Sequence, residues 1–327
     1  MIIRKYAAML LVLIHCSAAT AQTKMVYIPK NTGNPYFDPL IEGFKKAAEE
    51  AGDQFDSVSP ATADPTSQLP LVKAQVQRRV NVLGISPNSP EALNLAFKDA
   101  MRRGVIVICV DSDLTGNEQY RNVGVLTCDP EQIGRRQIEL LGSLIGYSGK
   151  FAILSATTDA PNQNMWIDWM KKALTDPKYS KMQLVDIVYG NDEPQKSLTE
   201  AEALMTRYPD LRGIISPTTV GIAACAQAVE TAGKADQIQV TGLGTPNQMR
   251  RFINNGTVKA FALWSPYDEG YLAGYIGSQI ASGKLNPAPG VKFDVPNLGQ
   301  HEFKEHNVVI TGPPVIFTKK NIDQFHF

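Results

Sequence analysis

Residues 25–37 read Met25-Val-Tyr-Ile-Pro-Lys-Asn-Thr-Gly-Asn-Pro-Tyr-Phe37, and they are the best single indication of how this chain folds. A short apolar run ends in a polar loop, and a helix-period segment begins at once and continues to Ala51. The loop is therefore expected at the carboxyl end of a strand, where open α/β sheets bind small ligands. It contains an ammonium group, two amides and two aromatic rings: Lys30, Asn31, Asn34, Tyr36 and Phe37.

That mixture of side chains suits a sugar, because planar polar groups meet hydroxyls and ring faces cover C–H surface. It does not suit a phosphate. The loop has a single glycine, Gly33, and cannot surround an anion with backbone N–H groups.

Strand-like and helix-like segments alternate along the rest of the chain. The apolar strand-like runs are Met25–Pro29, Val82–Ser86, Val105–Val110, Phe151–Ser155, Gln183–Val188, Gly213–Ser216, Gln239–Leu243 and Lys259–Trp264. The helix-period segments are Pro39–Ala51, Ser67–Arg78, Pro90–Arg103, Pro130–Leu144, Asn164–Thr175, Lys196–Tyr208, Val220–Gly233 and Pro246–Asn254. This alternation, with β-branched strands, favours parallel sheets that are covered on both faces.

The alternation predicts two lobes. It is interrupted at Tyr120–Asp129 and starts again at Phe151, which indicates two consecutive doubly wound halves. A single (β/α)8 barrel is the competing interpretation, because eight strands are countable. The ending beyond Ser282 is rich in Pro, Gly and charge and does not continue the barrel pattern. Helix starts are predicted at Ser89-Pro90 and Asp129-Pro130, where a capping residue precedes proline.

Residues 1–21 have the features of a secretory signal peptide. Arg4 and Lys5 precede the apolar run Ala7–Ile14, which is too short to span a bilayer, and Ala19-Thr20-Ala21 forms a cleavage site. Removing the leader leaves 306 residues (327 − 21), with 30 basic (32 − 2) against 32 acidic ones. This length favours two domains, and this balance predicts neither nucleic-acid binding nor membrane insertion.

Three cysteines remain after the leader: Cys109, Cys128 and Cys225. An odd number in an exported chain leaves at least one thiol unpaired. We interpret them as buried free thiols, and a Cys109–Cys128 bridge stays open as an alternative.

Polar residues gather after successive strand-like runs. Asp111-Ser-Asp113 follows one of these runs, Asn162-Gln163-Asn164 another, and Asn191-Asp192 a third. Each residue could also have a purely structural role, since a loop aspartate such as Asp111 often caps a turn. An isolated tryptophan such as Trp264 often packs in a core. Their shared position at strand ends indicates one ligand-binding cleft between the lobes.

Enzyme signatures are weak in this sequence. The four histidines are peripheral, there is no Gly-x-Ser-x-Gly, and no histidine follows a strand where a general base would be needed. Asp111 and Asp113 point to opposite faces if extended, which argues against a cation site. We therefore expect no enzymatic activity, no cofactor and no metal. The histidines are His15, His301, His306 and His326.

Four motifs resemble those of type I periplasmic sugar-binding proteins, the ribose/galactose-binding group: Ile28–Phe37, Val110–Asp113, Gly242–Pro246 and Phe261–Trp264. Four further segments look most like rhamnose-binding proteins: Phe151–Thr158, Asn162–Trp166, Pro217–Ala224 and Asn321–Phe325. The autoinducer-2 receptors are a sister branch, and the resemblance covers essentially the whole mature chain.

The resemblance implies a periplasmic, monomeric protein that binds a monosaccharide, with rhamnose as the expected sugar, and delivers it to the membrane permease of an ABC importer. Autoinducer-2, or another pentose or deoxy sugar, is the alternative ligand. It implies two lobes joined by a three-strand hinge, residues 24–125 with 246–264 and residues 126–244 with 265–327. The hinge strands are expected near Val125–Asp129, Leu243–Pro246 and Trp264–Asp268.

The predicted ligand-binding residues are Lys30, Asn34, Phe37, Asp111, Asn162, Gln163, Pro217, Thr219, Gly244 and Trp264. Lys30, Asp111, Gln163 and Pro217 match the pattern of the autoinducer-2 branch. Asn162 stands where that branch has aspartate, and Thr219 where it has alanine, which favours rhamnose. A sugar-responsive repressor would need a basic helix-turn-helix where the leader lies. Presentation of the ligand to a membrane sensor stays open.

Overall fold

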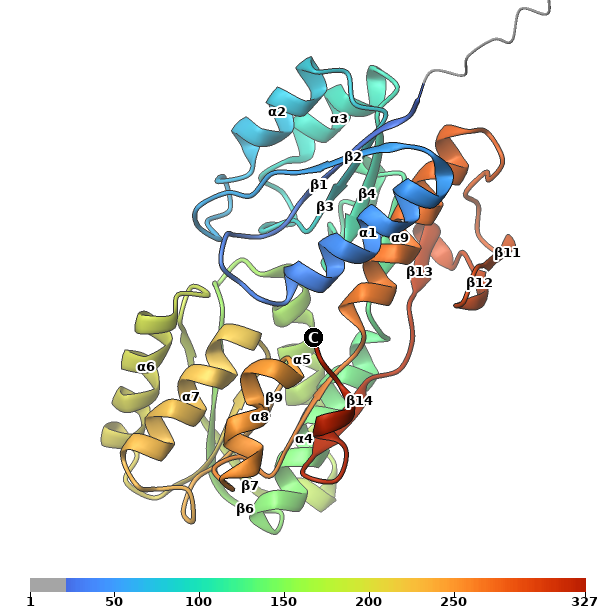
Figure 1. Cartoon of the computed structure of the whole chain (residues 1–327). Helices are drawn as coiled ribbons and strands as arrows, with labels where there is room; N and C mark the ends of the chain where they lie inside the picture. The colour runs from blue at the N-terminus through green and yellow to red at the C-terminus, as the bar shows by residue number, and fades with distance from the viewer. Residues whose placement is uncertain (1–21) are drawn as a thin grey trace, which may run out of the picture.

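The computed structural model describes residues 22–327 and shows two α/β lobes, each built on a parallel sheet (Figure 1). The predicted signal peptide, residues 1–21, lies outside the described residues. The first lobe contains a six-stranded sheet in the order β13-β5-β4-β3-β1-β2, with every neighbouring pair parallel. Its strands are β1 (Lys24–Ile28), β2 (Gln54–Ser57), β3 (Val82–Ile85), β4 (Ile106–Val110), β5 (Val123–Leu126) and β13 (Val308–Ile310).

Helices cover both faces of the first sheet. Successive side chains of a strand point to opposite faces, and here both faces carry apolar side chains that must be buried. In β1, Met25 and Tyr27 belong to the hydrophobic cluster beneath α1, whereas Val26 and Ile28 belong to the cluster beneath α2 and α3. Both clusters exclude water, so the central strands β3 and β4 are apolar throughout. The helices of this lobe are α1 (Phe37–Ala51), α2 (Leu69–Gln77), α3 (Asn94–Arg102) and α9 (Pro266–Ala281).

The second lobe contains a four-stranded parallel sheet in the order β7-β6-β8-β9. Its strands are β6 (Ser148–Ser155), β7 (Lys181–Tyr189), β8 (Leu211–Ser216) and β9 (Gln239–Gly242). A bridge between Leu243 and Ala262 adds β10 (Ala260–Leu263), which pairs antiparallel with β14 (Val315–Thr318). The helices are α4 (Pro130–Ile145), α5 (Pro161–Ala173), α6 (Pro194–Arg207), α7 (Thr219–Thr231) and α8 (Pro246–Asn254).

The remaining elements are short. A hairpin of β11 (Lys292–Val295) and β12 (Gly299–Glu302) follows α9. Single 3₁₀ turns occur at η1 (Glu118–Tyr120), η2 (Pro177–Tyr179), η3 (Glu305–Asn307) and η4 (Ile322–Gln324). Within residues 22–327, none of the helices is long and apolar enough to cross a membrane.

The predicted division of the chain between the lobes is wrong for residues 246–264, for residues 266–281 and for β13, whereas β14 pairs with β10 in the second lobe as predicted. Residues 246–264 were expected in the first lobe, but α8 packs beside α7 and β10 contacts β9, in the second lobe. Residues 266–281 were expected in the second lobe, but α9 packs along α1 and against β3, β4 and β5 in the first lobe (Figure 1). The order of the strands explains the difference. Because β10 extends the second sheet, the chain returns to the first lobe only after β10, at the start of α9.

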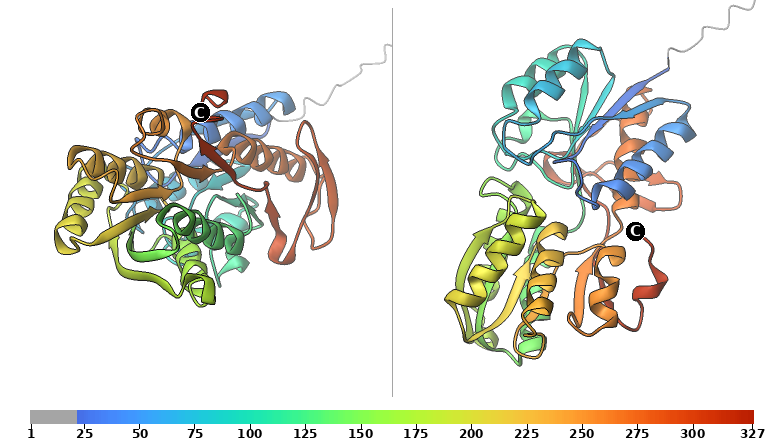
Figure 2. Two further views of the ribbon diagram at one scale, coloured as in Figure 1. Left: turned by 90° about the horizontal axis from the view of Figure 1, so that it is seen from below. Right: turned by 60° about the vertical axis from the view of Figure 1, so that its left-hand side comes forward.

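Over residues 22–327 the chain crosses between the lobes three times, after β5, between β10 and α9, and between β13 and β14 (Figure 2). The first and second crossings lie in the predicted hinge segments Val125–Asp129 and Trp264–Asp268. The predicted crossing at Leu243–Pro246 is wrong, because that segment joins two elements of the second lobe. The third crossing lies instead at residues 311–314, between β13 and β14.

Close glycine contacts explain why α9 belongs to the first lobe. A Cβ atom on Gly270 would lie 1.9 Å from the Leu40 carbonyl oxygen, and one on Gly43 would lie 2.0 Å from the Tyr267 carbonyl oxygen. Such distances are far below van der Waals contact, so α1 and α9 approach this closely only because both positions lack a side chain.

The predicted fold class is confirmed, and each of the eight predicted strands is present. The barrel alternative is excluded, because the parallel strands form two separate sheets. The supposed interruption at Tyr120–Asp129 contains the strand β5, and β2 and α9 were not predicted. Asp129 caps α4 as predicted, its Oδ1 accepting from the Glu131 N–H at 2.8 Å. Ser89 instead caps an isolated turn before α3.

Among residues 22–327, the three cysteines Cys109, Cys128 and Cys225 are buried and form no disulfide, so the alternative Cys109–Cys128 bridge is wrong. Burial raises the pKa of the Cys128 thiol to about 11, and it also raises the pKa values of the other two. These thiols act as small apolar side chains.

Candidate ligand-binding site

A cavity lies between the two lobes, where strand-end loops and helix starts meet. Residues from the first lobe form one wall, called here the first-lobe wall: Lys30, Asn34, Tyr36, Phe37 and Asp111. Residues from the second lobe form the second-lobe wall: Asn162, Gln163, Trp166, Asp192, Pro217, Thr218, Thr219, Leu243, Leu263 and Trp264.

Lys30 follows β1 and is 5% exposed. Its main-chain carbonyl accepts a hydrogen bond from Asn88 Nδ2 at 2.9 Å, which fixes the loop beside the end of β3. Its Nζ lies 3.7 Å from Asp111 Oδ2. Burial lowers the pKa of Lys30, while the carboxylate of Asp111 raises it in part.

Asp111 follows β4 in the left-handed region of backbone conformation, with φ of 64°. Its N–H donates to Glu269 Oε1 at 3.0 Å and to the Val125 carbonyl at 3.0 Å, so the sheet and α9 together define this conformation. Burial raises the pKa of Asp111, and the ammonium group of Lys30 opposes that shift. The result is a positioned carboxylate at the first-lobe wall.

A buried hydrogen-bonded chain lies behind this wall. Trp264 Nε1 donates to the Tyr36 hydroxyl at 2.7 Å, and that hydroxyl donates to Glu269 Oε2 at 2.5 Å. Glu269 is fully buried, and burial followed by the nearby charge of Asp111 raises its pKa well above the ordinary value. Because Trp264 precedes a crossing between the lobes, this chain connects the crossing to the main chain of Asp111.

Part of the second-lobe wall is built from the first turns of two helices, α5 and α7. Asn162 and Gln163 lie in the first turn of α5, which begins at Pro161. Gln163 Oε1 accepts from Ser155 Oγ at 2.6 Å and from the Ala156 N–H at 2.9 Å, so this side chain is fixed to the end of β6. Its amide nitrogen keeps its donors for other groups.

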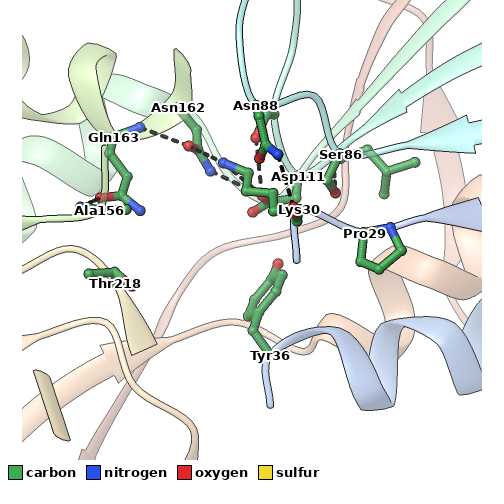
Figure 3. A network of polar contacts seen from close by, with 12 residues as sticks. Pro29, Lys30, Tyr36, Ser86, Asn88, Asp111, Ala156, Asn162, Gln163 and Thr218 are labelled. Atoms are coloured by element: carbon green, nitrogen blue, oxygen red, sulfur yellow. Dashed lines mark hydrogen bonds and ion pairs between the residues drawn. The ribbon is translucent and has the colours of Figure 1, made fainter. Parts of the chain in front are cut away.

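Two sets of hydrogen bonds join the walls across the cavity. Asn162 Oδ1 accepts from Lys30 Nζ at 2.8 Å, and Asn162 Nδ2 donates to Asp111 Oδ2 at 3.1 Å (Figure 3). Thr219 Oγ1 donates to Asn34 Oδ1 at 2.9 Å. The walls are therefore close enough for side chains of both lobes to contact one small ligand.

The structure brings nine of the ten predicted site residues to this cavity. Gly244 is the exception: it follows Leu243 of the wall, and its N–H donates to the Ala262 carbonyl at 3.2 Å. Gly244 was predicted from its place in a loop that follows a strand, but here its main chain joins β9 to β10.

Several lining residues were not predicted to bind ligand: Tyr36, Trp166, Asp192, Thr218, Leu243 and Leu263. Most of them lie within or next to the strand-end loops, so position alone was a usable signal. Glu269, behind the wall, gives no such signal. An acidic residue in the first turn of a helix is ordinarily a solvated partner of the helix dipole.

Asp113 has a structural role. Its Oδ1 accepts a hydrogen bond from Arg121 Nε at 2.6 Å, and its Oδ2 forms an ion pair with Arg121 Nη2. The Arg121 side chain is only 1% exposed. A guanidinium bound in this two-pronged way holds the loop after β4. Asp113 is therefore occupied, and of these two aspartates only Asp111 lines the cavity between the walls.

Comparison with known proteins identifies related chains. A family model described as a periplasmic binding protein domain matches residues 25–285. A sugar ABC transporter structure from Actinomyces odontolyticus ATCC 17982 is 40% identical, with a TM-score of 0.75, over 93% of this chain and 98% of the other.

Two further solved structures contain ligands. A solute-binding protein from Clostridium phytofermentas with bound L-rhamnose is 31% identical, with a TM-score of 0.90, over 93% of this chain and 98% of the other. LsrB from Clostridium saccharobutylicum in complex with AI-2 is 26% identical, with a TM-score of 0.88, over 93% of this chain and 100% of the other.

Proposed function

The chain belongs to the type I periplasmic sugar-binding protein family, and from this premise we propose that it captures L-rhamnose between its lobes. In this proposal the chain is exported and passes the sugar to the membrane permease of an ABC importer. It acts as a monomer and performs no chemistry on its ligand. The predicted leader, residues 1–21, supports the export step.

The observation that supports this proposal best is the polar cluster of Lys30, Asp111 and Asn162. These three groups bond to one another across the cavity, with an ammonium donor, a carboxylate acceptor and an amide that is both. A sugar hydroxyl also donates and accepts, so hydroxyls entering the cavity replace these bonds one for one. Charged partners make such bonds stronger than neutral ones.

The cavity also has an apolar side suited to a deoxy sugar. Phe37 and Trp264 are buried, and Trp166 and Trp264 lie edge to face with ring centroids 5.7 Å apart. Aromatic rings and leucine side chains at the cavity are suited to cover C–H surface and a methyl group. A phosphorylated ligand does not suit the site, since Lys30 faces two carboxylates, Asp111 and Asp192.

Autoinducer-2 is the second candidate, supported by the likeness to LsrB and by Lys30, Asp111, Gln163 and Pro217. Asn162 argues for the sugar. Its amide donates to Asp111 Oδ2 while its oxygen accepts from Lys30 Nζ, whereas an ionised aspartate at this position could only accept. The two candidates therefore differ in how they use position 162.

A thermal-shift and calorimetry panel tests the proposal on the purified chain without its leader. The panel contains L-rhamnose, D-ribose, D-allose, D-arabinose and autoinducer-2. We expect the largest rise in Tm and the lowest Kd with L-rhamnose, because binding to the folded state alone raises stability. A dominant response to autoinducer-2 would replace the ligand, and no response to any member would overturn the function.

A further inference from the structure

We propose that Asp192 is a ligand-binding residue of the second lobe, and that its free carboxylate oxygen accepts a hydrogen bond from a sugar hydroxyl. This inference rests on the proposed function and extends it. The recognition site then has two carboxylates, Asp111 on the first-lobe wall and Asp192 on the second-lobe wall.

Asp192 lies in the loop between β7 and α6 and lines the cavity with 5% exposure. Main-chain bonds define this loop: the Asn191 N–H donates to the Ala156 carbonyl at 2.8 Å, and the Glu193 N–H donates to the Gly190 carbonyl at 2.9 Å. Asn191 and Asp192 have φ values of 56° and 54°, a region that asparagine and aspartate tolerate best.

The carboxylate of Asp192 is not needed to begin the next helix. The N-terminal capping position of α6 is Glu193, and no side chain caps that helix by a hydrogen bond. A loop aspartate beside a helix start most often acts as a cap. Here the geometry removes that ordinary explanation and leaves the carboxylate directed at the cavity.

Only one oxygen of Asp192 has a protein partner. Thr218 Oγ1 donates to Asp192 Oδ1, while no group within residues 22–327 donates to Asp192 Oδ2. A carboxylate has room to accept several hydrogen bonds, and Oδ2 keeps its acceptor capacity where Asp192 lines the cavity. Since the residue lines the cavity, a ligand donor is the partner that completes it.

The charges around the cavity favour a neutral donor. Burial raises the pKa of Asp192, whereas the Thr218 hydroxyl and the ammonium of Lys30 lower it. Lys30 itself bonds to Asn162 and pairs with Asp111 across 3.7 Å, so its ammonium is already engaged. A hydroxyl supplies the missing donor without adding a charge to this buried set.

Asp192→Asn is a sharp test, because asparagine retains the backbone conformation and an oxygen that accepts from Thr218. It replaces only Oδ2, the free acceptor, by an amide donor. We expect the Kd of the best-bound sugar of the panel to rise by about 10- to 100-fold, the range of a hydrogen bond to a charged group. Calorimetry measures the Kd, and Tm without ligand reports folding.

Asp159→Asn is the matched control. Asp159 also follows a strand of the second sheet, and its Oδ2 accepts from the Thr158 hydroxyl at 3.1 Å, but it is exposed and does not line the cavity. We expect Asp159→Asn to bind the same sugar with the Kd of the wild type. Thr218→Val is a second variant that leaves Asp192 in place but removes its anchor, and we expect a rise in Kd of about 3- to 10-fold.

Monodeoxy analogues of the same sugar identify the hydroxyl. The analogue that lacks it should bind the wild type about 10- to 100-fold more weakly, and Asp192→Asn should weaken this analogue no further. If the wild type and Asp192→Asn bind the sugar with the same Kd, this inference is overturned and the proposed function still stands. A wild type that binds no member of the panel overturns the proposed function as well.

Discussion

The two walls of the cavity are built differently. On the first-lobe wall, Asp111 is fixed through its own main chain by the sheet and by the buried Glu269, and Lys30 pairs with it. On the second-lobe wall, Asn162 and Thr219 lie at helix starts and bond across the cavity to the first lobe. The first wall is therefore organised within its own lobe, whereas these second-wall bonds exist only while the lobes are together.

This difference suggests a division of roles. A wall organised within one lobe can engage the ligand before closure, and groups that bond across the gap contribute their free energy on closure. Substitutions in the first wall should then weaken ligand binding most, and those in the second should act mainly on the closed form. The following predictions test this comparison in order of decreasing effect.

Asp111→Asn should have the largest effect. The substitution keeps a residue that tolerates a φ of 64° but removes the charge that pairs with buried Lys30. A hydrogen bond from a ligand hydroxyl to a charged acceptor contributes about 1.5–3 kcal/mol, and loss of the charge also weakens the pairing that positions Lys30, so the Kd should rise about 100-fold or more, measured by calorimetry. An effect smaller than that of Asp192→Asn would reverse the order of the two walls.

Glu269→Gln should change how stability depends on pH. The pKa of Glu269 is raised above 4.5 by burial and by Asp111, so the folded chain holds its proton more tightly than the unfolded chain. Its stabilisation is full below pH 4.5 and is lost as pH rises through the folded pKa. The free energy of unfolding of the wild type should therefore exceed that of the variant by about 1–3 kcal/mol near pH 5, and this difference should be smaller at pH 8.

Urea unfolding at several pH values measures this difference. Glu50→Gln is the control: Glu50 also accepts from a tyrosine hydroxyl, that of Tyr271 at 2.6 Å, but that bond lowers its pKa. Its contribution is lost only as pH falls below 4.5, so its difference from wild type should be constant from pH 5 to pH 8. A constant difference for Glu269→Gln too would contradict the prediction.

Asn162→Asp distinguishes the two candidate ligands. It places a carboxylate beside Asp111, where the amide now donates at 3.1 Å, and the two negative charges repel. We expect the Kd for L-rhamnose to rise about 10-fold at pH 7.5, with less weakening at pH 5. Tighter binding of autoinducer-2 by this variant than by wild type, with sugar binding unchanged, would support the alternative ligand.

Thr219→Val should have the smallest effect. It removes the hydroxyl that donates to Asn34 Oδ1 across the cavity, one neutral hydrogen bond of the closed form. We expect a rise in Kd of about 3- to 10-fold, carried by a faster dissociation rate in stopped-flow measurements. Thr199→Val is the control, since Thr199 is exposed on α6 and bonds only within its own helix. An unchanged dissociation rate would show that this contact does not stabilise closure.

Local patterns were enough for most of the fold. The buried strands are continuous apolar runs, and the amphipathic helices have a clear 3.6-residue period, so each was predicted within a few residues. Several elements were missed, and for β2 and α9 the physical reason is clear. β2 is short and alternates between exposed and half-buried positions, and α9 is nearly apolar around its whole circumference, with Gly270 and other small residues against α1.

The site was predictable to the extent that it lies at strand ends. Lys30, Asp111 and Asn162 were identified because polar side chains directly follow apolar runs, and parallel strands bring their carboxyl ends to one edge. Glu269 could not be found this way. Its role depends on burial beside Tyr36 and the Asp111 N–H, residues more than 150 positions away in the chain.

The sequence by itself therefore determined the secondary structure, the two-lobed α/β class and the chemical character of the cavity, because these follow from short-range periodicity and from strand-end position. Tertiary structure decided which lobe takes residues 246–281, which of Asp111 and Asp113 is paired with Arg121, and which oxygen of Asp192 has no donor within residues 22–327. These depend on contacts between distant segments, and no local pattern encodes which buried group meets which.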